Sequence, residues 1–368
     1  MRVLISGYYG FDNLGDEAIL AALLQELKAR HPDWTPVVLS AKPSTTEALY
    51  GVPAVARDSL LGLWEEMGRA DLLLSGGGGL LQNVTSQLSL VYYLGVLELA
   101  LRRGTPYVLL GQGLGPFFGP GVLRMVGRYL SRARAIVVRD TESRHLAEEM
   151  GAGAAVRQAA DLALLLEPAP AAVAENLLQA AGVDPQQPVV GLILRDWQGR
   201  EPGEATARLC DHLQDERGLR CVLLPFQPGD TALAWRVAAT CASEPAVLDT
   251  PVSPAEMLAL LGRLALVVSM RLHGLIFCAA QQTPALGLAY DPKVYAFAAE
   301  AHQPTLPLDQ ASEQNLRVAV EDLWEARQTE APRRAETARR LRQSAELNLT
   351  VLDEVVGNLP AAGEGPPL

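Results

Sequence analysis

The chain has 368 residues, of which 49% are apolar and 20% charged, a composition typical of a globular protein long enough for two domains. The net charge of −11 argues against a groove for polyanionic nucleic acid but allows a local cationic pocket for a small anion. The four cysteines form no CxxC pair, which argues against a disulfide framework and a structural zinc site.

Two further patterns concern where the protein works. The N-terminal run Met1–Gly7 is too short and too quickly broken to be a signal peptide, and no run of about eighteen apolar residues is present. We therefore expect a cytoplasmic protein, which can still meet a membrane-borne substrate as a peripheral protein at the inner face of the membrane.

The first half of the chain alternates short apolar runs with amphipathic segments. The runs are nearly continuous in Val, Leu and Ile, which is typical of parallel strands covered by helices on both faces. The expected strands are Arg2–Ser6, Pro36–Ser40, Asp71–Ser75, Pro106–Gly111 and Ala135–Arg139, with a weaker one near Val156–Leu162.

The second half repeats this alternation after a change in composition. Residues 167–187 are rich in Ala, Pro and Gln and contain one short helical pattern, which together indicate a linker. Strands resume at Pro188–Leu194, Arg220–Leu224, Ala246–Asp249, Leu264–Ser269 and Pro284–Ala289.

These patterns predict two Rossmann-like α/β domains that face each other across a cleft, as in GT-B folds. Ligands then bind outside the carboxyl ends of the strands. The expected boundaries are 1–166 for the N-terminal domain, 167–187 for the linker, 188–311 for the C-terminal domain, 312–359 for helices that pack back, and 360–368 for a disordered tail.

An acidic segment, Gly7–Glu17, joins the first strand to the first helix. One interpretation is helix capping, in which Asn13 or Asp16 satisfies free N–H groups and acids favour the first turn. The other is a loop whose carboxylates, including Asp12, accept hydrogen bonds from sugar hydroxyls, with one of them acting as a general base. Different residues of the loop can serve each role.

Two glycine-rich segments end neighbouring expected strands. Ser75–Gly79 continues into Leu80–Asn83, and Gly111–Pro116 follows the next strand. Glycine lets the backbone approach a ligand closely and aim several N–H groups at an anion. We therefore expect both segments to contribute loops to one rim of the sheet.

Cationic residues stand at three other strand ends. Arg139 can pair with a ligand's carboxylate or phosphate, or equally with Asp140 or a local turn. Arg271 and His273 are two residues apart before Gly274, which makes His273 an acid/base candidate, although an isolated histidine is more often structural. Lys293 follows the last strand. The sequence contains no GxSxG, P-loop, HExxH or Asp-x-Asp pattern, so no metal site is expected.

Taken in order, these motifs resemble those of the polysaccharide pyruvyl transferase family, particularly its bacterial cell-wall branch (CsaB-like). The resemblance rests on Gly7–Leu20, Ser75–Asn83, Gly111–Pro116, Arg139-Asp140, Ser269–Gly274 and Tyr290–Lys293. It implies a GT-B-like fold and transfer of the enolpyruvyl group of phosphoenolpyruvate to a sugar as a ketal. It implies no cofactor beyond phosphoenolpyruvate as co-substrate. The implied acceptor is an N-acetylmannosamine unit of a lipid-linked cell-wall polymer precursor, whose ketal helps to anchor surface-layer proteins.

The resemblance also suggests roles for particular residues. The donor would be bound by Arg139, Arg271, Lys293 and the backbone of Gly77 and Gly78. His273, Arg271 and Asp16 would be catalytic. The acceptor would be bound by Asp12, Asn13, Asp16, Gln82, Asn83 and Gln112.

Two other functions fit the same motifs. A metal-independent GT-B glycosyltransferase would use the cationic residues to hold the diphosphate of a nucleotide sugar, because a fold does not determine a function. The second is a sugar-binding paralogue without catalysis, against which the retained Arg, His and Lys weigh.

Overall fold

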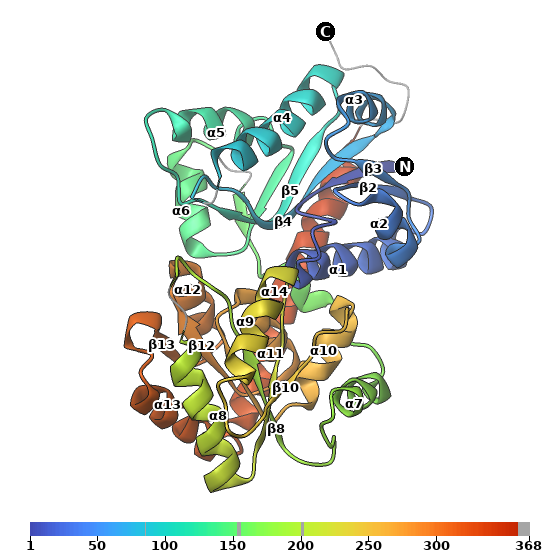
Figure 1. Cartoon of the computed structure of the whole chain (residues 1–368). Helices are drawn as coiled ribbons and strands as arrows, with labels where there is room; N and C mark the ends of the chain where they lie inside the picture. The colour runs from blue at the N-terminus through green and yellow to red at the C-terminus, as the bar shows by residue number, and fades with distance from the viewer. Residues whose placement is uncertain (85, 153–155, 200–201, 360–368) are drawn as a thin grey trace. The chain divides into compact units, whose positions relative to one another are not determined.

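The computed structural model describes residues 1–84, 86–152, 156–199 and 202–359, which form two compact units (Figure 1). Unit 1 consists of Met1–Gly10, Leu23–Leu165 and the chain from Gln343 on, and unit 2 consists of Phe11–Ala22 and Leu166–Arg342. Each unit is built on one parallel sheet with helices packed on it. The prediction of two Rossmann-like α/β domains of the GT-B type is confirmed.

The units differ from the expected boundaries at both ends of the chain. Phe11–Ala22 belongs by its contacts to unit 2, and the last helix, α14 (Ala331–Gly357), is divided between the units. The segment interpreted as a linker contains a helix, α7 (Ala171–Ala180), which packs against α10 (Pro254–Arg263). Residues 360–368, where a disordered tail was expected, lie outside the described residues.

Unit 1 is organised around a sheet in the order β3-β2-β1-β4-β5-β6-β7, with every neighbouring pair parallel. The chain runs from β1 to one edge and then crosses back to β4, so the topological switch point lies between these strands. The strands are β1 (Arg2–Ser6), β2 (Thr35–Ser40), β3 (Ala54–Ala56), β4 (Leu72–Leu81), β5 (Tyr107–Leu114), β6 (Ala135–Val138) and β7 (Val156–Gln158). The helices are α1 (Leu14–Arg30), whose residues up to Ala22 belong to unit 2, α2 (Pro43–Tyr50), α3 (Leu60–Arg69), α4 (Gln87–Arg103), α5 (Val122–Leu130) and α6 (Thr141–Glu149).

The glycine-rich segments do not form the loops that were expected. They extend β4 and β5, with Gly76 paired to Leu110 and Gly78 paired to Gln112 before the register shifts. Gly77 and Gly78 have φ angles of 80° and 82°, which L side chains rarely adopt. Glycine therefore allows the strand to kink and continue, so that β4 stays paired with β5 as far as Leu81, whose partner is Leu114.

Unit 2 repeats this topology with the order β10-β9-β8-β11-β12-β13, again parallel throughout. Its switch point lies between β8 and β11. The strands are β8 (Val189–Ile193), β9 (Arg220–Leu223), β10 (Ala246–Val247), β11 (Leu266–Ser269), β12 (Ala285–Ala289) and β13 (Thr305–Pro307). The remaining helices are α8 (Gly203–Arg217), α9 (Pro228–Ala238), α11 (Leu272–Gln281), α12 (Pro292–Glu300) and α13 (Glu313–Ala326). In the part of the chain that the structure describes, no helix combines the length and the hydropathy that a membrane crossing needs.

Candidate functional site

The carboxyl edge of the unit 2 sheet gathers polar side chains from four strand ends. Arg195 follows β8, Asp230 lies in the first turn of α9 after β9, Arg271 precedes α11 after β11, and Tyr290 follows β12. The carboxyl ends of parallel strands meet at one edge, and the ends of β8 and β11 flank the switch point. This edge is the candidate site of unit 2.

Arg271 is a buried cation with one carboxylate partner. Its guanidinium forms an ion pair with buried Asp230 and donates to Gln227 Oε1 at 3.2 Å. Its backbone is held by Ser269, whose Oγ accepts from Arg271 N at 3.1 Å. Burial lowers the pKa of the Arg271 guanidinium from its ordinary value, and the carboxylate of Asp230 opposes that shift. The side chain is therefore fixed in place, with its charge neutralised by Asp230.

A second arginine lies near the first and is framed by two aromatic rings. Arg195 donates to the Tyr290 hydroxyl at 2.8 Å, and its guanidinium carbon lies 5.0 Å from the Trp197 ring centre and 5.3 Å from that of Tyr290. The positive charge of Arg195 contributes to lowering the pKa of Arg271. Among the described residues, the buried Nε atoms of both arginines have no hydrogen-bond acceptor. Two buried donors without acceptors suit an anionic ligand.

Tyr290 and Lys293 complete the rim of this site. Burial raises the pKa of the Tyr290 phenol while Arg195 and Arg271 oppose the rise, so the hydroxyl that accepts from Arg195 keeps its own proton to donate. Lys293 Nζ lies 3.3 Å from Asp291 Oδ2, and its side chain is half exposed at the start of α12. Lys293 is thus a more mobile cation than the two arginines.

The acidic segment reaches this same site through the first turn of α1. Leu14 N donates to Phe226 O at 2.9 Å, and Asn13 Nδ2 lies 3.5 Å from Gln227 Oε1, which also accepts from Arg271. Asn13 is the helix cap, because its Oδ1 accepts from Gly15 N at 3.0 Å and from Asp16 N at 3.4 Å. The two interpretations of the segment therefore separate, with capping assigned to Asn13, while Asp16 is half-buried in the first turn.

His273 lies directly against the backbone of this turn. A Cβ atom added to Gly15 would stand 2.1 Å from Nδ1 of His273, so the ring contacts residue 15 in a way that only glycine permits. Asp12 is exposed, with a left-handed φ of 56°. The predicted Asn13, Asp16, Arg271 and His273 thus belong to one site in unit 2.

Arg139 belongs to unit 1, at the end of β6. Its buried guanidinium pairs with buried Asp161 at 2.8 Å and lies 3.8 Å from Asp140. Asp140 itself caps α6, with its Oδ1 accepting from Ser143 N at 2.7 Å. Gly113 provides room for the guanidinium, since a Cβ there would lie 3.0 Å from it. Arg139 therefore pairs with Asp161, a partner that sequence reasoning did not consider.

Several predicted acceptor and donor residues of unit 1 hold the backbone. Gln112 is fully buried, accepts from Ser75 Oγ at 3.2 Å and donates to Gly78 O at 2.7 Å, so it cross-links β4 and β5 and presents no surface to a sugar. The role predicted for Gln112 is corrected accordingly. Gly77 is buried within β4 rather than in a loop. Gln82 accepts from Val84 N at 2.7 Å.

Comparison with known proteins identifies the family. Residues 13–292 match the family model described as polysaccharide pyruvyl transferase, from the capping Asn13 to just beyond Tyr290. The chain belongs to the polysaccharide pyruvyl transferase family. No curated protein sequence matches it.

Solved structures share the fold at low identity. A putative UDP-N-acetylglucosamine 2-epimerase from Listeria monocytogenes has a TM-score of 0.64 at 12% identity, with 100% of this chain and 99% of that chain covered. UDP-GlcNAc 2-epimerase from Neisseria meningitidis, bound to UDP-GlcNAc, has a TM-score of 0.62 at 11% identity and coverages of 96% and 100%. The ADP-heptose lps heptosyltransferase II of E. coli has a TM-score of 0.54 at 16% identity and coverages of 89% and 100%.

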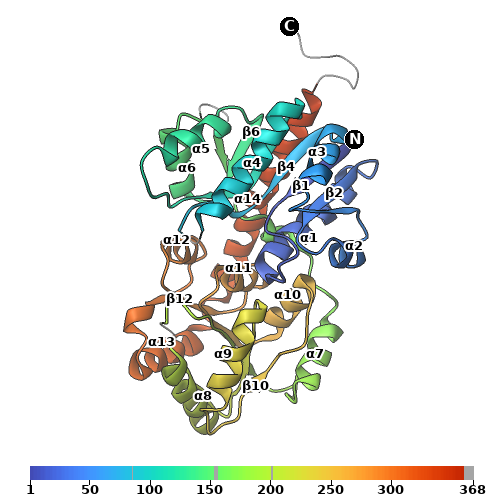
Figure 2. The ribbon, with the colours of Figure 1, turned by 45° about the horizontal axis from the view of Figure 1, so that its top comes forward.

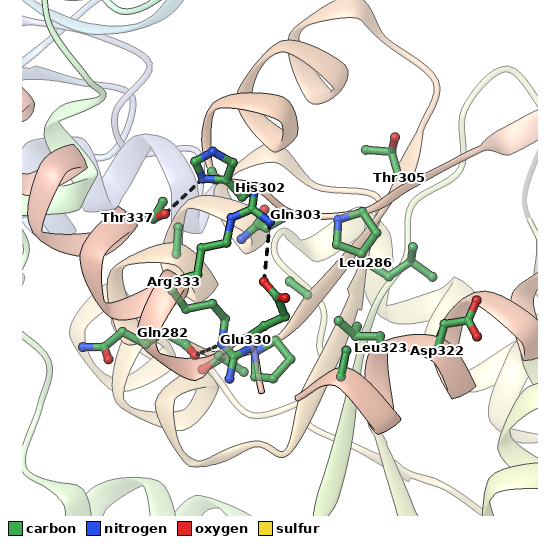
Figure 3. Close-up of a pocket in the computed structure, with 18 of the residues that line it drawn as sticks. Gln282, Leu286, His302, Gln303, Thr305, Asp322, Leu323, Glu330, Arg333 and Thr337 are labelled. Atoms are coloured by element: carbon green, nitrogen blue, oxygen red, sulfur yellow. Dashed lines mark hydrogen bonds and ion pairs between the residues drawn. The ribbon is translucent and has the colours of Figure 1, made fainter. Parts of the chain in front are cut away.

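A cavity of about 560 Å³ lies elsewhere in unit 2, away from the site of this pyruvyl transferase family member (Figure 3). It opens between the amino ends of β12 and β13 and the helices α13 and α14. His302 Nδ1 lies 3.1 Å from Thr337 Oγ1, and Arg333 lies 3.5 Å from Glu330. The predicted site residues follow the carboxyl ends of the strands, so this cavity is at the opposite edge of the sheet from them.

Four residues of the unit 2 site were not predicted from the sequence. They are Arg195, Trp197, Gln227 and Asp230. A signal for the first two was present, because Leu194-Arg195-Asp196-Trp197 places an arginine and an aromatic residue directly after an apolar strand. Asp230 had no such signal, since it is one turn into a helix.

Proposed function

We propose that the protein transfers the enolpyruvyl group of phosphoenolpyruvate to a sugar as a cyclic ketal and releases phosphate. The observation that carries the proposal is the pair of neighbouring arginines in unit 2, Arg195 and Arg271. Arg271 pairs with Asp230, and the buried Nε atoms of both arginines have no hydrogen-bond acceptor among the described residues. Phosphoenolpyruvate is a small anion with a carboxylate and a phosphate, so it can occupy both cations at once.

The reaction balances as one addition followed by one displacement, with a proton moved in each step. The methylene carbon of the donor gains a proton to become a methyl group, and the first sugar hydroxyl adds to C2 and loses its proton. The second hydroxyl then displaces phosphate at C2, and its proton leaves with phosphate or with a base. His273, two residues after Arg271, is the acid/base candidate. Asp16 lies in the first turn of α1, which His273 contacts at Gly15, and its carboxylate can assist a hydroxyl.

The acceptor in this proposal is a sugar of a lipid-linked polymer precursor, with an N-acetylmannosamine unit as the first choice. Family membership supports a polysaccharide acceptor. Asp12 and Asp16 supply carboxylate oxygens suited to hydroxyl groups, while the amide oxygen of Asn13 is used in the helix cap. On this proposal the protein acts in cell-wall polysaccharide biosynthesis at the inner face of the membrane, on polymers that anchor surface-layer proteins.

The decisive experiment measures phosphate released from phosphoenolpyruvate with a panel of N-acetylhexosamine lipid precursors. Release that depends on both donor and acceptor, and a product that gains the mass of the pyruvyl group, would support the proposal. Donor hydrolysis without an acceptor, or no release with any precursor, would contradict it.

A glycosyltransferase acting on a nucleotide sugar is the second candidate. The tilted Trp197 and Tyr290 rings, with centres 4.6 Å apart, favour it, because aromatic faces can also pack against a nucleobase. The melting temperature separates the two functions: phosphoenolpyruvate alone should raise it in a pyruvyl transferase, whereas a nucleotide sugar alone should raise it in a glycosyltransferase.

A further inference from the structure

Large apolar side chains are exposed on neighbouring helices of unit 1. α3, α4 and α5 lie side by side on one face of the sheet and cover a common core (Figure 2). The exposed residues, which we call the apolar band, are Leu60 (78% exposed), Leu61 (69%), Leu88 (80%), Val91 (58%), Phe118 (61%) and Met125 (41%). Exposed leucines are unremarkable singly, but a group of them on adjoining elements is typical of a docking surface.

The apolar band is not needed to hold the helices on the sheet. The inner faces of α3, α4 and α5 already bury residues such as Leu63, Leu94 and Val126 in the core. On α4 the outward stripe runs from Leu88 through Val91 to Gly95, at the helical spacing where a surface helix normally carries polar side chains. These outward side chains therefore have a use other than folding.

The position of the apolar band links it to the carboxyl edge of the unit 1 sheet. Leu60, Leu61 and Leu88 lie in the first turns of helices that follow β3 and β4, and Phe118 follows β5. Asn83 fixes the Phe118 segment, donating to Phe118 O at 2.7 Å and accepting from Phe118 N at 2.8 Å. The band is thus held rigidly at the edge of unit 1 where Arg139 also lies.

Two exposed cations lie beside the apolar band, although the chain as a whole carries −11. Arg124 and Arg128 are exposed on α5, on either side of Met125 in the sequence. Apolar tips among arginines are suited to an anionic bilayer surface, where the tips enter the interface and the cations meet phosphates. A second copy is a poorer partner, because a symmetric contact would bring the same arginines together.

We propose that the apolar band docks unit 1 on an anionic phospholipid bilayer. This inference deepens the proposed function, which places the protein at the inner face of the membrane, by naming the surface of unit 1 that meets the lipid; the observations behind it are not those that support the proposed reaction. It would hold the carboxyl edge of unit 1 at the surface from which a lipid-linked sugar projects.

The test is flotation of the full chain with vesicles, without donor or acceptor. Vesicles of phosphatidylcholine with about one quarter phosphatidylglycerol should bind the protein, and pure phosphatidylcholine should bind it far more weakly. Leu88→Ser/Val91→Ser should weaken binding by at least about tenfold. Arg124→Gln/Arg128→Gln should weaken it by about 30-fold and reduce its sensitivity to salt. The matched control, Leu49→Ser/Val318→Ser, changes side chains that are 63% and 48% exposed but lie on α2 and α13, and it should bind like the parent.

Four outcomes would overturn docking. They are absence of vesicle binding by the parent, equal binding to both lipid mixtures, equal loss in the control, and a dimer in sedimentation that only the band variants disrupt. Melting temperatures verify folding, and the arginine variant remains informative if the Leu88→Ser/Val91→Ser variant fails to fold. Failure here is distinguishable from failure of the proposed function, because phosphate release from phosphoenolpyruvate is measured in a separate assay.

Discussion

Replacing Gly15 by alanine perturbs His273 without changing any group proposed to bind or transfer. The new Cβ would lie 2.1 Å from Nδ1 of His273, 2.4 Å from its Cγ and 2.9 Å from its Cβ. Comfortable contacts between heavy atoms need about 3.5 Å, so the ring has to move by roughly 1 Å or more. Because the Cβ of His273 is crowded as well, rotation of the ring alone does not relieve the contact. Either the first turn of α1 or the start of α11 has to shift.

The expected result is a large loss of turnover with a small loss of stability. A displacement of about 1 Å in a catalytic group can cost about 10²-fold in rate. The free energy of unfolding should change by no more than about 1–2 kcal/mol, because strain from overpacking is partly offset by the higher helix propensity of alanine. Affinity for phosphoenolpyruvate should be nearly unchanged, since Arg195 and Arg271 are not touched. Single-turnover phosphate release, calorimetry with phosphoenolpyruvate and thermal melting provide the three measurements.

Two controls make the Gly15→Ala result interpretable. Gly95 lies in α4 with no atom within 4 Å of an added Cβ, so Gly95→Ala should keep full activity and stabilise the protein by about 0.5–1 kcal/mol. In a His273→Ala background, which alone should lower turnover by about 10²–10⁴-fold, Gly15→Ala should cause little further loss of turnover, because the ring whose displacement would lower turnover is no longer present. Full activity of Gly15→Ala, or losses that multiply in the double variant, would refute the reasoning.

The remaining predictions concern charges. Arg271→Lys should weaken phosphoenolpyruvate binding by about ten- to a hundredfold, because an ammonium cannot reproduce the planar fork that pairs with Asp230, and unchanged affinity in calorimetry would contradict this. Asp16→Asn should slow the reaction with the acceptor while the affinity for phosphoenolpyruvate is kept, since a carboxylate suits a hydroxyl and repels an anion. Loss of affinity for phosphoenolpyruvate with unchanged acceptor kinetics would contradict this role. Asp161→Asn should lower the free energy of unfolding by about 3–5 kcal/mol in denaturant titrations, because it leaves buried Arg139 without its nearest carboxylate. A change below about 1 kcal/mol would show that the pair does not stabilise the fold.

The central strands were largely predictable because each is a short apolar run that the sheet buries on both faces, whereas the partly buried strands β3 and β13 were not predicted. Arg2–Ser6 is confirmed residue for residue as β1, and most others agree within one or two residues. The glycine-rich segments were misjudged because glycine is a turn signal in isolation, whereas here the positive φ angles of Gly77 and Gly78 serve an irregular pairing with β5. Local propensity carries no information about a neighbouring strand that keeps such a segment extended.

The site was predictable to the extent that its residues directly follow strands. Arg271 and His273 were found in this way. Asp230 and Asp161 were not, because they are paired through space with arginines 41 and 22 residues away. The assignment of Phe11–Ala22 to unit 2 was hidden for the same reason, since it depends on hydrogen bonds to the segment after β9, such as that from Leu14 N to Phe226 O.

The division of α14 affects the order in which the protein can become stable during synthesis. Unit 1 begins with the first residue but includes the chain from Gln343 on. Asn348 is fully buried there and donates to Ala160 O at 3.0 Å, while Asp353 bonds to His31 at 2.8 Å. A nascent chain released as far as β13 contains every strand of unit 1 but lacks the helix that covers part of its core. We therefore expect N-terminal fragments of the protein to expose apolar surface and to depend on chaperones, whereas unit 2 can complete itself earlier on the ribosome.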